Sequence, residues 1–203
     1  MADDPPVAAV ILAAGLARRM GGRDKLTADL GGLPVLRHVA LAARDAGLSP
    51  LVAVVGPAHG GARDALAGLD IRYAVNADPA RGLASSLQAG LAALPEDAEA
   101  AAICLGDMPL LRAATLRALV RALVEAPRAE AAIPVQDGGW GNPVIWRRRR
   151  FGDLMALTGD RGARGLLEAL PDAGRVLLPV DDPGVRRDID TPADLADLRR
   201  DPG

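Results

Sequence analysis

The sequence has 203 residues, with 24 basic and 26 acidic side chains and a formal net charge of −2. Balanced charge argues against a nucleic-acid-binding surface spread over the chain, and an aromatic content of 2% argues against platforms for base stacking. Apolar runs stay shorter than the roughly eighteen residues of a membrane span. We therefore expect a cytoplasmic protein that acts on small molecules, without nucleic-acid or membrane partners.

Short apolar runs alternate with amphipathic stretches, a pattern typical of an α/β fold with a mostly parallel sheet between helices. The predicted strands are 7–12, 51–55, 71–75, 101–105, 131–135, 143–146 and 175–179. The predicted helices are 35–46, 62–66, 83–94, 111–125, 151–157, 163–170 and 192–200. Because no repeat or linker interrupts this pattern, we expect one domain over residues 1–203, mobile at 1–6 and 201–203. Ligands of such sheets bind at the carboxyl ends of the strands.

The segment after the first predicted strand, residues 12–25, contains glycines, paired arginines and the only lysine of the chain, Lys25. The spacing of its glycines matches neither the dinucleotide-binding fingerprint nor the P-loop motif. Glycines nevertheless allow backbone N–H groups to face an anion, and Arg19 and Lys25 supply charge that would neutralise phosphates. A surface turn with solvated arginines is the alternative interpretation. The placement of a lone lysine among arginines favours phosphate binding.

Two acidic segments are candidates for holding a metal ion. Asp107 follows the strand at 101–105, where a carboxylate would suit a hard cation, although a turn aspartate bonded to its own backbone is an alternative. Asp188 and Asp190 are two positions apart and would face the same side of an extended segment. Residues 191–194, Thr-Pro-Ala-Asp, predict the start of a helix. Asp190 is not needed for that cap and is left to bind a metal.

The one cysteine, Cys104, lies in an apolar run. We expect it to be buried in a strand, and a single cysteine forms no intrachain disulfide. His38 and His59 lack the spacing of zinc ligands, and no Ser-His-Asp arrangement is evident. The arginine run at 147–150 predicts solvated side chains at the start of a helix. The alternative is that these arginines bind an anionic acceptor.

Six segments, in order, resemble the signature motifs of the molybdenum cofactor cytidylyltransferases, within the MobA-like NTP transferase family. Together they span residues 10–195, nearly the whole chain. They are Leu12-Ala13-Ala14-Gly15 with Arg19-Met20-Gly21 and Lys25, Gly82-Leu83-Ala84-Ser85-Ser86-Leu87, Leu105-Gly106-Asp107-Met108-Pro109, Gly141-Asn142-Pro143-Val144, Gly159-Asp160-Arg161-Gly162-Ala163-Arg164 and Asp188-Ile189-Asp190-Thr191-Pro192. One departure is Ala17, where the family commonly carries a serine, so a hydroxyl near the phosphates is missing.

The resemblance implies a three-layer nucleotidyltransferase fold and the transfer of CMP from CTP to the phosphate of molybdopterin or molybdenum cofactor. It implies that Asp107 and Asp190 bind Mg²⁺, with Asp188 as an additional candidate ligand, and that the catalytic residues are Arg19, Lys25 and Asp107. The implied nucleotide-binding residues are Leu12, Ala13, Ala14, Gly15, Lys25, Asn76, Gly82, Ser86 and Asp107. The implied acceptor-binding residues are Asn142, Arg161 and Arg164.

Several alternatives remain open at this point. Without the resemblance, residues 82–86 are an ordinary helix start with surface hydroxyls, and Asn76 is a turn former. The enzyme could use GTP or another acceptor. A protein of a different class, a non-catalytic escort that carries molybdenum cofactor to a molybdenum hydroxylase, would need neither the lysine nor all of the aspartates. A molybdenum hydroxylase apoenzyme is the implied protein partner.

Overall fold

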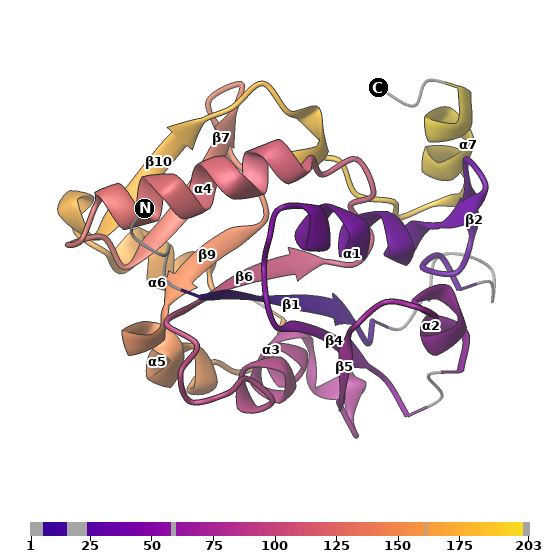
Figure 1. The fold of residues 1–203 in the computed structure, drawn as a ribbon, viewed down its shortest axis with the longest axis horizontal. Helices are drawn as coiled ribbons and strands as arrows, with labels where there is room; N and C mark the ends of the chain where they lie inside the picture. Colours follow the sequence, from indigo (N-terminus) through magenta and orange to yellow (C-terminus); the bar gives the residue numbers. More distant parts are fainter. Residues whose placement is uncertain (1–5, 16–23, 58–59, 161, 201–203) are drawn as a thin grey trace.

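The computed structural model describes residues 6–15, 24–57, 60–160 and 162–200. Arg19, His59 and Arg161 lie outside the described residues, as do the predicted mobile ends 1–6 and 201–203 apart from Pro6. The main sheet has the strand order β10-β7-β9-β6-β1-β4-β5, with β8 paired to β7 (Figure 1). Its strands are β1 (Val7–Ala13), β4 (Leu51–Val55), β5 (Arg72–Val75), β6 (Ala100–Leu105), β7 (Ala131–Gln136), β8 (Gly139–Trp140), β9 (Val144–Arg147) and β10 (Arg175–Pro179).

Most pairings in this sheet are parallel, as the alternation of strands and helices predicts. Strand β1 is parallel to both β4 and β6, β5 is parallel to β4, and β10 is parallel to β7. Strand β9 is the exception in the middle of the sheet, antiparallel to β6 and β7. A separate antiparallel hairpin of β2 (Asp29–Leu30) and β3 (Leu33–Pro34) precedes the first helix.

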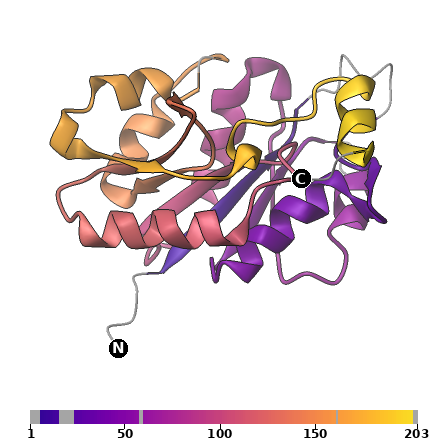
Figure 2. The same cartoon turned by 90° about the horizontal axis from the view of Figure 1, so that it is seen from above.

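Helices cover both faces of the sheet and make a three-layer α/β fold, which confirms the predicted fold class (Figure 2). One face carries α1 (Val35–Asp45), α2 (Gly60–Ala65) and α4 (Ala113–Glu125); the other carries α3 (Leu83–Ala92), α5 (Phe151–Met155) and α6 (Arg164–Ala169). Strand β1 is buried throughout, and its alternate side chains enter the two apolar layers. Helix α7 (Pro192–Arg200) packs beside β2.

The seven predicted strands and seven predicted helices are all present, with ends within two residues of the predicted positions. The prediction missed β2, β3 and β8, each of which has only two residues, too few for an alternating pattern to appear. In the part of the chain that the structure describes, no helix has both the length and the apolar character needed to cross a membrane.

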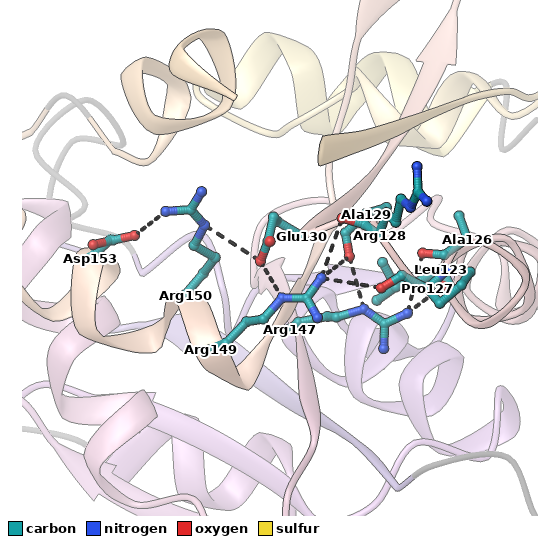
Figure 3. Close-up of polar contacts among 10 residues, drawn as sticks. All are labelled: Leu123, Ala126, Pro127, Arg128, Ala129, Glu130, Arg147, Arg149, Arg150 and Asp153. Carbon is teal, nitrogen blue, oxygen red and sulfur yellow. Dashed lines mark hydrogen bonds and ion pairs between the residues drawn. The ribbon is translucent and has the colours of Figure 1, made fainter. Parts of the chain in front are cut away.

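The arginine run at 147–150 leads into a helix as predicted, but the guanidinium groups of Arg147, Arg149 and Arg150 are not simply solvated (Figure 3). Arg147 donates to the carbonyls of Leu123 and Ala129 at 2.7 and 2.9 Å, and Arg149 bonds Glu130 at 2.6 Å. Leu123 lies in the last turn of α4, whose terminal carbonyls have no partner within the helix. The run therefore fastens the end of α4 to β9, and this use of its side chains argues against the acceptor-binding alternative.

Cys104 is fully buried in β6, as predicted, and burial raises the pKa of its thiol to about 12. At about pH 8 the group stays protonated, and the thiolate is the reactive form. We expect no modification of the folded protein by a thiol-reactive disulfide reagent, and complete modification in denaturant. Since Cys104 is the only cysteine, the absorbance change reports it directly. Rapid modification of the folded chain would contradict the burial.

Candidate nucleotide and metal site

Strands β1 and β6 end side by side, and this edge carries the candidate site. Leu12 pairs with Leu105, and the N–H of Gly106 donates to the carbonyl of Leu12 at 3.0 Å. A side chain at position 106 would place its Cβ 2.8 Å from that carbonyl oxygen, so the close approach requires glycine. The next residue, Asp107, therefore projects from the sheet edge beside the end of β1.

The segment with Asp188 and Asp190 reaches Asp107 through a backbone hydrogen bond. The N–H of Ile189 donates to the backbone carbonyl of Asp107 at 2.9 Å, and the Ile189 side chain is fully buried against Leu195 and its neighbours. The flanking aspartates lie on the more exposed side, as expected for an extended segment. Carboxylate oxygens of Asp107, Asp188 and Asp190 all lie within 4.8 Å of one another.

The start of α7 confirms the predicted cap. The N–H of Asp194 donates to Oγ1 of Thr191 at 3.2 Å, and the carboxylate of Asp194 accepts from the N–H groups of Thr191 and Asp190 at 2.7 and 3.0 Å. This reciprocal pattern is a capping box with aspartate at its third position. These hydrogen bonds lower the pKa of Asp194 and fix the backbone that presents the Asp190 side chain.

Lys25 lies between two of the carboxylates, an arrangement that the sequence did not predict. Its Nζ donates to Oδ2 of Asp107 at 2.6 Å and to Oδ1 of Asp190 at 3.1 Å. The adjacent backbone is held by Asp24, whose carboxylate accepts from the N–H of Leu26, and Leu26 is buried in the core. The Asp190 side chain, which the cap does not use, thus accepts a hydrogen bond from a cation supplied by the protein.

The electrostatics of the cluster favour a cation. Burial alone would lower the pKa of Lys25. The hydrogen bonds that Lys25 donates to Asp107 and Asp190, together with the negative charges of these two residues, outweigh burial and raise that pKa. Partial desolvation raises the pKa of Asp188, and the charges of the two other carboxylates raise it further. Three carboxylates next to one ammonium therefore leave excess negative charge that a divalent cation would neutralise.

A pocket of about 570 Å³ opens at this edge. Predicted nucleotide-binding residues line it: Leu12, Ala14, Gly15, Gly82, Ser86 and Asp107. Ala13 is the last residue of β1 and is buried. Asn76 is also buried behind the pocket, where its side-chain amide donates to Oγ of Ser85 and of Ser86 at 2.9 and 3.0 Å. Both hydroxyls are buried, which corrects the alternative of surface serines, and a direct nucleotide contact by Asn76 stays a prediction.

A second cavity of about 210 Å³ adjoins this pocket, because Leu12, Leu83 and Leu105 line both. The side chains of Trp140 and Trp146, together with further aliphatic groups, make its walls mainly apolar. Two of the predicted acceptor-binding residues, Asn142 and Arg164, also line it. The Arg164 guanidinium lies 5.6 Å from the ring centre of Trp140 and pairs with Glu168 at 3.0 Å.

The profile of the MobA-like NTP transferase domain matches residues 9–188, which include both pockets and two of the three clustered aspartates. The chain belongs to the MobA-like NTP transferase family.

Solved structures of similar sequence share the fold of this MobA-like chain over almost its full length. Rv0371c from Mycobacterium tuberculosis H37Rv is 30% identical with a TM-score of 0.83, covering 97% of this chain and 99% of that one. The same protein was also solved in complex with manganese, at 29% identity and a TM-score of 0.76, covering 96% and 98%. A nucleotidyl transferase from Methanothermobacter thermautotroptrophicus is 25% identical with a TM-score of 0.81, covering 96% of each chain.

Among curated proteins, the bifunctional protein GlmU of Clavibacter sepedonicus is 38% identical over 169 residues, 79% of this chain. That match spans only 33% of GlmU, and the match to GlmU of Burkholderia ambifaria (strain MC40-6) spans 30%. The MobA-like chain thus corresponds to about a third of these curated relatives.

Sequence reasoning missed several residues that line the two pockets of the MobA-like chain. Asp160 lines the pocket of about 570 Å³, although sequence reasoning assigned it to a motif without a role. Trp140 and Trp146 line the apolar cavity; their rarity in a chain with 2% aromatics was the available signal. Arg19 and Arg161 lie outside the described residues, so their predicted roles stay predictions.

Proposed function

We propose that the protein is a cytoplasmic cytidylyltransferase that transfers CMP from CTP to the terminal phosphate of molybdopterin or molybdenum cofactor and releases pyrophosphate. The observation that carries this proposal is that a pocket bearing Asp107 and a mainly apolar cavity share Leu12, Leu83 and Leu105 in their walls. The first suits an NTP and its cation; the second suits the ring system of an acceptor. The product would pass to a molybdenum hydroxylase apoenzyme.

Mg²⁺ is the cation that we propose for Asp107 and Asp190, with Asp188 beside them. Carboxylate oxygens are the ligands that hard divalent cations prefer, and a separation within 4.8 Å fits a single ion. The manganese complex of Rv0371c supports a divalent metal in a protein of this fold. When bound, the metal would offset the negative charge of the NTP phosphates.

The chemistry needs no covalent enzyme intermediate. An acceptor phosphate oxygen attacks the α-phosphorus of CTP, a new P–O bond forms, and the bond to the pyrophosphate leaving group breaks. The acceptor is already anionic, so no strong general base is required. The contribution of the protein is to align two anions and to stabilise charge through Lys25 and Arg19.

The walls of the second cavity favour an acceptor with a planar ring. The half-buried indole of Trp140, the buried indole of Trp146 and several aliphatic side chains offer apolar contact, whereas the hydroxyl groups of a sugar would need polar partners. Asn142 and Arg164 supply polar groups in this lining that suit the polar edge of a pterin or its phosphate, and Arg161 is the third residue proposed for that role.

A pyrophosphate-release assay over the four NTPs, each with and without molybdopterin, tests the proposal. We expect release with CTP only, and only when the pterin is present. Release with GTP would show that the protein is a guanylyltransferase. Release with another phosphorylated acceptor would show that the second cavity binds that acceptor and not molybdopterin. Tight pterin binding without release from any NTP would instead favour a non-catalytic escort.

A further inference from the structure

A loop after α5 joins the two pockets. We name residues 157–160, 162 and 163 the bridging loop. Asp160 lines the nucleotide pocket, whereas Gly162 and Ala163, followed by Arg164 at the start of α6, line the apolar cavity. The loop is therefore a wall of both binding spaces, and a shift of its backbone would alter both.

The bridging loop is fastened to the first turn of α3. The N–H of Leu83 donates to Oδ1 of Asp160 at 3.1 Å, and the N–H of Ala84 donates to the carbonyl of Gly159 at 3.1 Å. The first N–H groups of a helix have no partner within it, so this contact satisfies two of them from a distant part of the chain. A carboxylate is also favoured there by the helix dipole.

Close packing leaves the loop little freedom at this contact. Gly82 has φ +91°, and a Cβ there would lie 2.5 Å from Oδ1 of Asp160 and 2.8 Å from the carbonyl oxygen of Gly159. A second attachment comes from Gln88 on the same helix, whose side-chain amide donates to the carbonyls of Met155 and Leu157 at 2.9 Å each. Helix α3 thus holds the loop at two separate points.

We propose that Asp160 is a positioning residue that sets the alignment of nucleotide and acceptor by fixing the bridging loop to the N-terminus of α3. The proposal rests on the proposed function, because only a transfer between the two pockets depends on their relative placement. In this role its carboxylate accepts a hydrogen bond from the backbone N–H of Leu83 and acts on the reacting atoms only through the position of the loop. Small displacements of aligned reactants reduce the rate steeply.

The variants Asp160→Ala and Asp160→Asn distinguish a positioning role from a direct action of the Asp160 charge on the substrate. Asparagine keeps an acceptor oxygen and loses the charge, whereas alanine loses both. For Asp160→Ala we expect roughly tenfold faster hydrogen–deuterium exchange at the amides of Leu83 and Ala84, measured without substrate. We expect kcat of pyrophosphate release with CTP and molybdopterin to fall roughly tenfold to a hundredfold. Asp160→Asn should stay within about threefold of the parent in both measurements.

Asp153→Ala is the matched control, since Asp153 on α5 pairs with Arg150 and lines neither pocket of the site. Gln88→Ala, a milder change, should speed amide exchange at residues 155–158 and lower kcat less than Asp160→Ala does.

Parent-like exchange and kcat in Asp160→Ala would overturn the proposal. So would an Asp160→Asn protein with parent-like exchange and the kcat of the alanine variant, because charge would then act on substrate directly. A parent protein without any turnover would count against the proposed function. The exchange data would still show whether Asp160 fastens the bridging loop to α3.

Discussion

Asp107→Asn should lower the rate of pyrophosphate release roughly 10²- to 10³-fold while the protein stays folded. The substitution removes the carboxylate that lies closest to Lys25, at 2.6 Å, and that lines the nucleotide pocket. Asparagine is nearly isosteric and retains an oxygen that can accept from Lys25, and Lys25 keeps Asp190 as its charged partner, so the free energy of unfolding should change by roughly 1–2 kcal/mol. Single-turnover rates and chemical denaturation measure the two effects separately.

Asp45→Asn provides the matched control, because it makes the same chemical change in an exposed pair with Arg44 on α1. It should leave turnover and stability at the parent values. If Asp107→Asn released pyrophosphate at the parent rate with unchanged unfolding, the metal assignment would be wrong. A large loss of stability instead would show that the Asp107–Lys25 pair has a mainly structural role.

Lys25→Met should change catalysis and metal binding in opposite directions. We expect turnover to fall roughly 10²-fold, because the charge that offsets the phosphates is lost. In the absence of nucleotide, Mn²⁺ should bind about tenfold more tightly, because the ammonium no longer competes for Asp107 and Asp190. Electron paramagnetic resonance of unbound Mn²⁺ measures the affinity without any need for turnover.

Lys25→Arg is the control that keeps the positive charge. Its planar group fits the carboxylates differently from a compact ammonium, so we expect intermediate turnover and a Mn²⁺ affinity close to that of the parent. An unchanged or weaker Mn²⁺ affinity in Lys25→Met would show that the lysine does not occupy the position of the metal.

The layer structure and one edge of the site could be predicted from the sequence. Continuous apolar runs such as β1 can be buried on both faces only between helices, and a parallel sheet brings the ends of β1 and β6 to one edge. The two-residue spacing of Asp188 and Asp190 was also sufficient to place both carboxylates on one side of an extended segment.

The contacts made between distant residues could not be predicted. Lys25 and Asp190 are 165 positions apart, and no periodicity encodes that their side chains meet. The attachment of Asp160 to α3 likewise depends on where a loop crosses a helix end. The prediction for the arginine run was incomplete for the same reason. Four adjacent charges predict hydration, and Arg148 and Arg149 are exposed, but tertiary structure also brings a carbonyl of α4 within reach of Arg147.

The small apolar cluster of Leu30, Val35, Ile189, Leu195 and Leu198 has a consequence for the order of events during synthesis. It joins a hairpin near the amino terminus to a helix near the carboxyl terminus, and Asp190 is presented only once that helix has docked. During synthesis, Asp107 leaves the ribosome well before Asp190. Asp190 can therefore join Asp107 only after the segment that carries Leu195 and Leu198 has been synthesised and has packed against Leu30 and Val35.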